Sequence, residues 1–170
     1  VEKLTNGADA DDPNGSDVPR LVPGDAVTWT YAVTNIGVVS IPGIDITVTD
    51  STPGVVPVLD PASDTGGDGI LSPGEMWLYV ASGPALDLPA VPAGSGISIV
   101  DGCFTEFEFG QPGTRATYEN VGTVTVPGSS DEDSSHYCNP APEIAVEKLT
   151  NGADADDPNG SDVPRLVPGD

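Results

Sequence analysis

AVTWTYAVTNIG, residues 26–37, is the stretch that decides the fold. Val27, Trp29, Tyr31 and Val33 alternate here with small or polar residues. Such alternation is typical of a β-strand with one buried face, because successive side chains point to opposite sides of a sheet. We therefore expect a strand with both large aromatic residues in the core.

Shorter segments along the chain repeat this alternation, and Gly and Pro separate them. With 21 Gly and 18 Pro in 170 residues, long helices are excluded, because both residues interrupt helical hydrogen bonding. In IDITVTD, residues 44–50, we expect Ile44, Ile46 and Val48 on the core face. Short strands at this spacing predict an all-β fold, an antiparallel sandwich. The other predicted strands are 1–5, 55–60, 76–83, 95–100, 102–110 and 114–126.

Residues 146–170 repeat residues 1–25, VEKLTNGADADDPNGSDVPRLVPGD, without one substitution. Because Val146 takes the place of Val1, the period is 145 residues, which is the signature of a tandem array. We predict one domain over residues 1–145, followed by the first strand and acidic loop of the next identical repeat. Neighbouring repeats joined head to tail are the expected partners, and lateral contacts between fibres are a further option.

The formal net charge of −22 excludes partners that need a basic surface, such as nucleic acid and anionic membranes. No apolar run approaches the length of a membrane helix, so no membrane insertion is expected in this segment. The acidic residues gather in short stretches, which favours local cation sites, with a solvated acidic surface from a saline habitat as the alternative. We expect an extracellular or cell-surface protein whose export signals and anchors lie outside this segment.

Each repeat carries two cysteines, Cys103 and Cys138, and their spacing matches no zinc pattern. An even count suits one disulfide in an oxidising compartment. We predict a bridge that ties a middle strand to the end of the domain.

The segment DTGGDGILSPGE, residues 64–75, has the twelve-residue layout of an EF-hand calcium loop. Calcium takes about six to eight hard oxygen ligands, and this spacing can wrap most of them around one ion. Position three is Gly66, so water or a backbone carbonyl must substitute there. The predicted calcium ligands are Asp64, Gly66, Asp68, Ile70 and Glu75.

A second acidic loop, ADADDPNGSD, lies near the start of each repeat. Its carboxylates repel one another unless they are protonated or bind a cation, although Asx-rich loops also form plain turns. The second copy follows the short linker NPAPEI, so we predict a calcium ion between that copy and the preceding domain's end, which carries Asp131, Glu132, Asp133 and Glu143. The predicted loop ligands are Asp9, Asp11, Asp12, Asn14 and Asp17, and in the second copy Asp154, Asp156, Asp157, Asn159 and Asp162.

Several segments resemble the immunoglobulin-like repeat domains of large bacterial and archaeal surface proteins. TYAVTNIG and ITVTD resemble that family's TYxVTNxG and VTVTD strands, and DGILSPGEMWLYVASG is similar to its NGDGxLxPGExWxYxAxG segment. DEDSSHY resembles the closing D-x-D-x-SHY, whereas CFTEFEFG and the cysteines depart from the pattern. The resemblance implies an immunoglobulin-like β-sandwich in an exported, tandemly repeated structural domain that often binds metal and has no catalytic role.

His136 is the only histidine, and we expect it to pack or hydrogen-bond rather than to bind metal. Without a second histidine or a free thiol, no set of catalytic residues is readable, so no enzyme activity is expected.

Lys3 is the only lysine in the repeat and lies on the first predicted strand, where we expect it to face the solvent. Asn120 lies on a late predicted strand. The alternative to a solvent-facing lysine is a crosslink, because this order of residues resembles surface-protein domains that form an intramolecular Lys–Asn isopeptide bond with an assisting carboxylate.

These features together predict a structural repeat of a calcium-stabilised extracellular filament, stalk or sheath. The principal alternative is an adhesin whose sandwich loops bind a glycan or a host protein, and a carbohydrate-processing module is a second. Exposed aromatic loops would favour sugar binding, yet Trp29 and Trp77 lie in strand patterns and are expected in the core.

Overall fold

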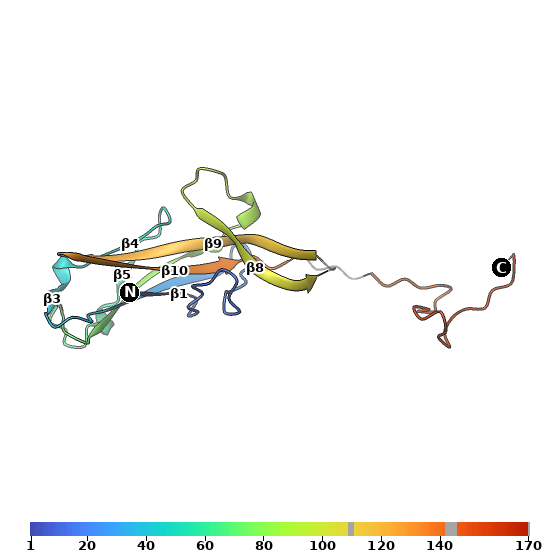
Figure 1. Ribbon diagram of the computed structural model, residues 1–170, viewed down its shortest axis with the longest axis horizontal. Helices are drawn as coiled ribbons and strands as arrows, with labels where there is room; N and C mark the ends of the chain where they lie inside the picture. Colours follow the sequence, from blue (N-terminus) through green and yellow to red (C-terminus); the bar gives the residue numbers. More distant parts are fainter. Residues whose placement is uncertain (109–110, 142–145, 170) are drawn as a thin grey trace. The chain divides into compact units, whose positions relative to one another are not determined.

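The computed structural model describes residues 1–108, 111–141 and 146–169 (Figure 1). The chain forms two compact units, Val1–Pro140 and Ala141–Asp170. The described residues contain strands, turns and short 3-10 segments but no α-helix, which confirms the predicted all-β class. None of their helical segments is long and apolar enough to cross a membrane.

Ten antiparallel strands are described in the first unit, together with three 3-10 turns. The strands are β1 (Glu2–Thr5), β2 (Ala26–Thr34), β3 (Ile41–Pro42), β4 (Thr47–Asp50), β5 (Val58–Leu59), β6 (Ile70–Leu71), β7 (Met76–Pro84), β8 (Ser98–Glu108), β9 (Gln111–Val126) and β10 (Ser129–Cys138). The turns are Gly43–Asp45, Pro61–Ser63 and Leu88–Ala90.

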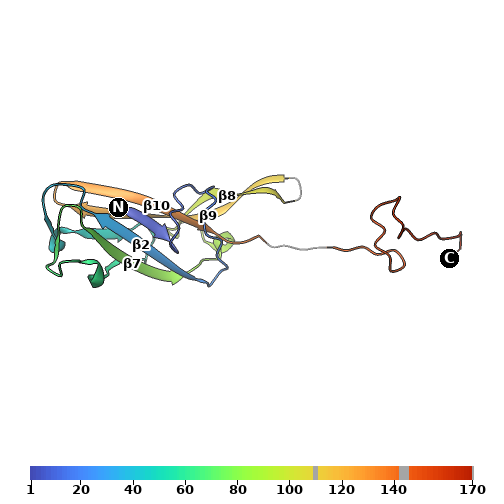
Figure 2. The ribbon, with the colours of Figure 1, turned by 90° about the horizontal axis from the view of Figure 1, so that it is seen from below.

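Two larger sheets organise this unit. The first has the strand order β1-β2-β7-β5, and the second has the order β10-β9-β4 with β8 also paired to β9. Figure 2 shows β2 and β7 in one layer and β9 and β10 in the other. Strands β3 and β6 form a small separate pair. The long strand β9 therefore pairs with β4 and β8, which precede it in the chain, and with β10, which follows it.

The core lies between the two larger sheets, as the alternation in β2 predicts. Trp29 and Tyr31 are buried, and Trp77 on the neighbouring strand β7 is buried with them. The rings of Trp29 and Tyr118 are 6.1 Å apart between centroids, and Tyr118 stacks on Tyr137 at 4.6 Å. Aromatic contacts of this kind add to the burial of apolar area. The Trp29–Tyr118 contact joins the two sheets, whereas Tyr118 and Tyr137 are neighbours within the second sheet.

Three predicted strand segments, 44–50, 95–100 and 102–110, are arranged differently in the structure. The segment 44–50 does not begin as a strand, because Gly43–Asp45 forms a 3-10 turn and leaves Ile44 94% exposed. Its prediction as a core residue is therefore wrong, whereas Ile46 is buried as expected. The segments 95–100 and 102–110 were predicted as separate strands, but one strand, β8 (Ser98–Glu108), spans parts of both, with a register shift after Gly102. Residues 109–110 lie outside the described residues.

The second unit repeats the local turns of the first without its sheet. Thr150 and Ala153 form the same isolated bridge as Thr5 and Ala8. The described residues 146–169 contain no strand, and Lys148 is exposed. The turn is thus encoded locally, whereas the β1 strand needs the pairing to β2 that the first unit supplies.

Candidate functional site

The acidic loop after β1 begins with a tight reversal of the chain. Thr5 and Ala8 exchange backbone hydrogen bonds of 2.8 and 3.0 Å, and Asn6 adopts a left-handed backbone with φ of 50°. Asparagine tolerates this conformation better than most residues do. Its side-chain oxygen also accepts a 2.7 Å hydrogen bond from the backbone of Thr28, which fixes the turn against β2.

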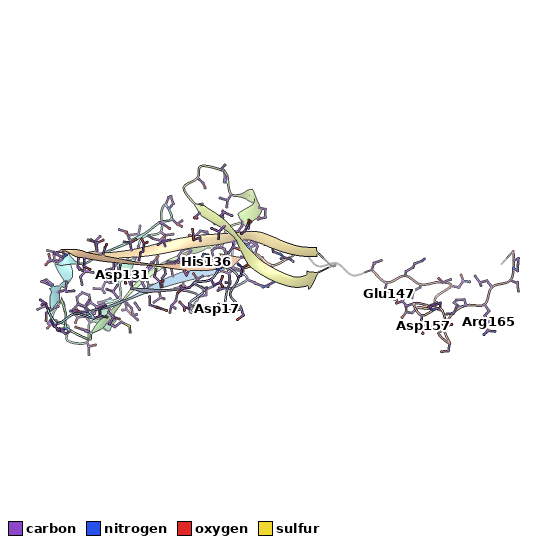
Figure 3. All side chains as sticks on the ribbon, viewed as in Figure 1. Asp17, Asp131, His136, Glu147, Asp157 and Arg165 are labelled. Carbon is purple, nitrogen blue, oxygen red and sulfur yellow. A yellow bond between two sulfur atoms is a disulfide. The ribbon has the colours of Figure 1, made fainter. Side chains whose placement is uncertain are left out.

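Ala10 anchors the middle of this loop in the interior. It is fully buried, its N–H donates to the carboxylate of Asp17 at 2.8 Å, and its carbonyl oxygen lies 2.7 Å from Nδ1 of His136. Figure 3 labels His136 and Asp131 on β10 and Asp17 in the loop. His136 is therefore a buried hydrogen-bonding residue, as predicted, and it holds the acidic loop against β10.

The loop brings Asp9 close to the carboxylates of Glu2 on β1 and of the distant residue Asp133 on β10. One carboxylate oxygen each of Glu2, Asp9 and Asp133 lies within 4.8 Å of the others. Asp133 is held there because it also accepts a 2.6 Å hydrogen bond from the backbone of Lys3, which ties β1 to β10. Glu2 was not among the predicted ligands.

The electrostatics of this group, which we call the Glu2 cluster, are those of crowded negative charge. The pKa of Glu2 is raised because its carboxyl shares a hydrogen bond with Asp9 and lies near the charges of Asp9, Asp133 and Asp11. The pKa of Asp11 is raised as well, first by burial and then by the charges of Asp133 and Asp9. Glu2 and Asp11 therefore ionise less readily than usual, and a bound cation would relieve the repulsion.

The second unit contains a related group of its own. Glu147, Asp154 and Asp156 converge within the same 4.8 Å limit, and all three are exposed. Glu147 and Asp154 are the copies of Glu2 and Asp9. The first two carboxylates of each group are therefore brought together by the local turn. The third carboxylate differs: it is Asp133 in the first unit and Asp156 in the second.

The EF-hand-like loop has a different geometry. Asp64 accepts hydrogen bonds from the backbone of Gly67 at 2.8 Å and of Gly69 at 2.9 Å. Glu75 accepts from Thr65 at 3.2 Å and from Ser72 at 2.8 Å, so the first and last acidic positions both close the loop on itself. Among the described residues, Asp64, Asp68 and Glu75 do not form a converging carboxylate group.

The other predicted ligands of this loop lie around that turn. Asp68 accepts a 2.9 Å hydrogen bond from the backbone of Ile70, where β6 begins. Gly66 lies beside Asp68, and a Cβ atom added at Gly66 would be in ordinary van der Waals contact with the Asp68 carboxylate. Glu75 also accepts from the indole of Trp77 at 3.2 Å, which links the loop to the core.

Several residues predicted as ligands of the first acidic loop have local roles. Asp12 caps a turn by accepting a 2.9 Å hydrogen bond from the backbone of Asn14, and Asp157 does the same for Asn159 in the second unit. Asp131, predicted from the end of the domain, is on β10, and its carboxylate lies 2.5 Å from the nitrogen of Val1 at the start of the chain. None of these residues, nor Asp17 or Asp162, belongs to a converging carboxylate group in the described parts of the chain, and Glu143 lies outside those parts.

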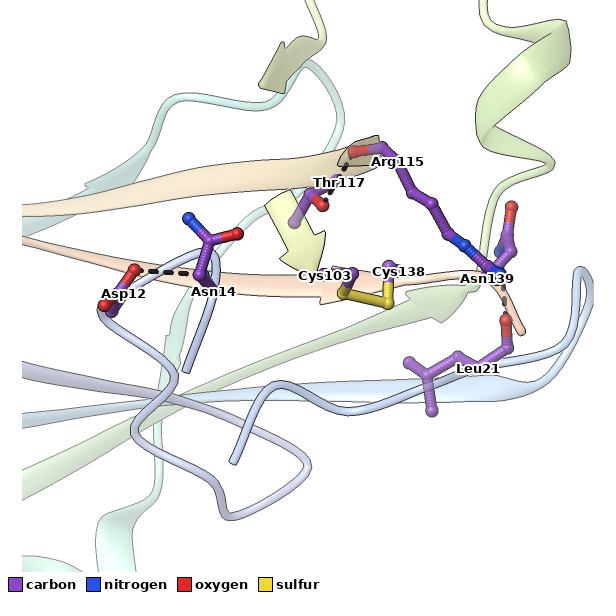
Figure 4. The surroundings of a disulfide bond; sticks show 8 residues. All are labelled: Asp12, Asn14, Leu21, Cys103, Arg115, Thr117, Cys138 and Asn139. Atoms are coloured by element: carbon purple, nitrogen blue, oxygen red, sulfur yellow. Dashed lines mark hydrogen bonds between the residues drawn. A yellow bond between two sulfur atoms is a disulfide. The ribbon is translucent and has the colours of Figure 1, made fainter. Parts of the chain in front are cut away.

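The predicted disulfide between Cys103 and Cys138 is present (Figure 4). It joins β8 to the last residue of β10, and both cysteines are buried. The loop 13–21 packs over it, because the carbonyl of Pro13 accepts from the Cys103 N–H at 2.7 Å and that of Pro19 accepts from the Cys138 N–H at 3.0 Å. The bridge therefore braces the acidic loop that supplies Asp9 to the Glu2 cluster.

Comparison with known proteins adds no relative. A scan against protein-family models and searches of curated proteins and solved structures found no match to this chain.

Proposed function

We propose that this chain is a structural repeat of a long extracellular filament, stalk or sheath, with an immunoglobulin-like sandwich as its unit. The observation that carries the proposal is the unchanged return of residues 1–25 at 146–170. In the first unit this segment supplies β1 and the acidic loop, so its copy is suited to start another unit of the same kind. The buried disulfide supports an oxidising location outside the cell.

We further propose that each repeat binds calcium at the Glu2 cluster. Three carboxylates from β1, the acidic loop and β10 supply hard oxygen ligands, and backbone carbonyls and water can complete the coordination. A cation there would join the first and last strands of the unit, because Glu2 lies on β1 and Asp133 on β10. Loop 64–75 is a second candidate, because its sequence spacing fits calcium although its carboxylates bind backbone N–H groups.

Calcium is expected to raise the melting temperature of the protein. An ion that binds only the folded state at about ten times its dissociation constant adds roughly 1.4 kcal/mol to the free energy of unfolding. For a protein of this length that corresponds to a rise of roughly 3–5 °C, measured by calorimetry with calcium and with a chelator. Identical melting curves in the two conditions would contradict a calcium site.

The variants Asp9→Asn and Asp64→Asn separate the two candidate sites. Asp9→Asn removes one of the repelling carboxylates, so in chelator it should melt above the wild type and in calcium it should lose most of the calcium-dependent rise. Asp64→Asn is the matched control, because it makes the same chemical change in the other loop. Retention of the full rise by Asp9→Asn and its loss in Asp64→Asn would assign calcium to loop 64–75.

The predicted calcium clamp between repeats stays a prediction and has its own measurement. Small-angle scattering of a two-repeat protein should show a longer and less flexible particle with calcium than with chelator. Changing Asp154, Asp156 and Asp157 to Asn should abolish that difference, because the acidic loop of the second copy would no longer hold the ion. Equal maximum dimensions in every condition would mean that calcium acts only inside each repeat.

The adhesin alternative has one observation in its favour. Ile36, Val38 and Ile44 are 95%, 93% and 94% exposed, and they lie in the segment from the end of β2 to the turn before β4. Apolar side chains so fully exposed are suited to contact with another protein surface.

A further inference from the structure

Lys3 is buried, and the expectation that it faces the solvent is wrong. Its exposed fraction is 0%, whereas Lys148, which has the same neighbours in sequence, is exposed in the second unit. The burial of Lys3 is therefore produced by the strands that pack on β1 and not by the local sequence. Burying an amine is costly, so the contacts of this side chain call for an explanation.

The amine of Lys3 lies against β9 and β10. Its Nζ donates to the hydroxyl of Ser135 at 2.6 Å and to the main-chain oxygen of Asn120 at 2.9 Å, and it lies 5.7 Å from the centre of the Tyr31 ring. No ion pair to a carboxylate of the described residues neutralises it. Burial lowers the pKa of Lys3 to about 8, against the opposing charges of Asp50, Asp133 and Asp11. Far more of the neutral amine, the nucleophilic form, is thus present near neutral pH than for an exposed lysine.

The side chain of Asn120 is equally unusual. It is fully buried, and its Nδ2 donates to the hydroxyl of Tyr118 at 2.7 Å. Its Oδ1 has no hydrogen-bond partner among the described residues. Buried polar atoms are nearly always paired, so an amide with an unpaired oxygen beside a buried amine points to a chemical role.

Asp50 supplies a carboxyl group to the same interior space. Its carboxylate accepts hydrogen bonds from the hydroxyl of Tyr31 and, at 2.7 Å, from the backbone of Thr52. Burial raises the pKa of Asp50, while hydrogen bonds from Tyr31, Thr52 and Asn120 and the charge of Lys3 oppose that rise. The raised pKa makes the Asp50 carboxylate a stronger base than an exposed aspartate.

Gly122, which has no side chain, leaves space for the side chain of Lys3 beside the Tyr31 ring. It lies opposite Asp50 in the pairing of β4 with β9, two residues beyond Asn120. A Cβ at this position would lie 2.6 Å from the Tyr31 ring and 3.0 Å from Cδ of Lys3. Any larger residue would displace the lysine stem, so the glycine is part of the lysine's binding space.

We propose that Lys3 and Asn120 form an intramolecular isopeptide bond, with Asp50 as the group that moves the proton. The neutral Nζ attacks Cγ of Asn120 and forms a new C–N bond. Asp50 takes a proton from the attacking nitrogen and passes it to Nδ2, the Cγ–Nδ2 bond breaks, and one ammonia molecule leaves. No oxidant or cofactor is needed, because one amide is exchanged for another.

The bond would join the two sheets covalently. Lys3 is on β1 in the first sheet and Asn120 is on β9 in the second. The covalent path from β1 to Cys138 would then cross to β9 at Asn120. From there it would follow the chain into β10, or return along β8 to Cys103 and cross the disulfide to Cys138. Both routes would bypass β2 to β7. A pulling force along a fibre would leave the core of each repeat folded.

Intact mass and peptide mapping of the full 170-residue protein test the bond. The mass should be lower by one ammonia than the sequence with its disulfide requires. After reduction and alkylation, trypsin should leave Lys3 uncut and release residues 1–20 joined to residues 116–148. Lys148 is the internal control, because it has the same sequence context without Asn120 beside it and should be cut normally.

Variants separate the bond from other losses of ammonia. Asn120→Ala and Asp50→Ala should each restore the full mass and the cut at Lys3, and formation of the disulfide would show that each variant folds. Asn–Gly steps such as Asn6–Gly7 can also lose ammonia by forming a succinimide, which yields no joined peptides. Full mass in the wild type, or ammonia loss without the joined peptides, would overturn the proposal whatever the variants do.

Discussion

Replacing Cys103 and Cys138 by alanine lowers the free energy of unfolding by about 3–4 kcal/mol. The bridge closes a loop with a sequence separation of 35 residues, and without it the unfolded chain regains the freedom that this closure removes. The native state loses contacts as well, because both cysteines are buried. Denaturant unfolding followed by tryptophan fluorescence measures the change, since Trp29 and Trp77 are both in the core.

The location of the bridge adds a second expected effect. The backbone of Cys103 and Cys138 is hydrogen-bonded to Pro13 within the acidic loop and to Pro19 just after it. Without the bridge this segment is less firmly held, so calcium affinity at the Glu2 cluster should fall together with stability. The reduced wild-type protein is the control, because it opens the bond and keeps the sulfur atoms. A double variant as stable as the oxidised wild type would show that the bridge does not constrain the fold.

The strands whose buried face the sequence predicts are those with apolar buried side chains. Strand β1 was predicted as a strand, but the burial of its residues Lys3 and Thr5 was not. In β2 the large residues alternate with small or polar ones, and the structure buries them as that pattern requires. Strand β10 was not predicted, because its buried residues include Ser135 and His136. These are stabilised by hydrogen bonds to Lys3, Thr5 and Ala10, which lie more than a hundred residues away in the sequence. A hydrophobic pattern cannot reveal a strand of this kind.

The candidate metal site was predicted in part, for a similar reason. Asp9 and Asp133 were both predicted as ligands from their acidic surroundings, Asp133 together with the loop of the next repeat, but Glu2 was not predicted. A single acidic residue in an ordinary strand gives no local signal. Only the contact of β1 with β10, made through the hydrogen bond of Lys3 to Asp133, brings it to the other two.

Lys3 and Lys148 show the limit of local sequence most directly. The 25 residues around each are identical, yet one lysine is buried and the other is exposed. The difference lies in Asn120, Ser135 and Tyr31, which surround Lys3 through long-range strand pairing. The order of lysine and asparagine in the sequence suggested the crosslink, but the assignment depends on burial that the sequence does not encode locally.

The variant Asn120→Ala, in which Lys3 must stay a free amine, should become more stable as the pH rises from about 7 to about 10. The pKa of Lys3 is about 8 in the folded protein and about 10.5 when the chain is unfolded. Between these values the unfolded state binds a proton that the folded state does not bind, so rising pH favours folding. The expected gain is about 2.5 kcal/mol over this range. Above about pH 10 the trend should reverse, because the buried Tyr31 and Tyr118 have raised pKa values and resist ionisation in the folded state.

Comparison with the double variant Lys3→Met/Asn120→Ala isolates the lysine, because the two proteins share every other titrating group. Asp50, Asp133 and Asp11, which act on the charge of Lys3, are all present in both. Urea unfolding at a series of pH values should show the rise in the single variant and its absence in the double variant. In the wild type the proposed bond would turn the amine into an amide, so its stability should follow the flat profile of the double variant. A wild type that instead rises with pH as the single variant does would show that Lys3 is buried as a free amine, and the crosslink would then have to be abandoned.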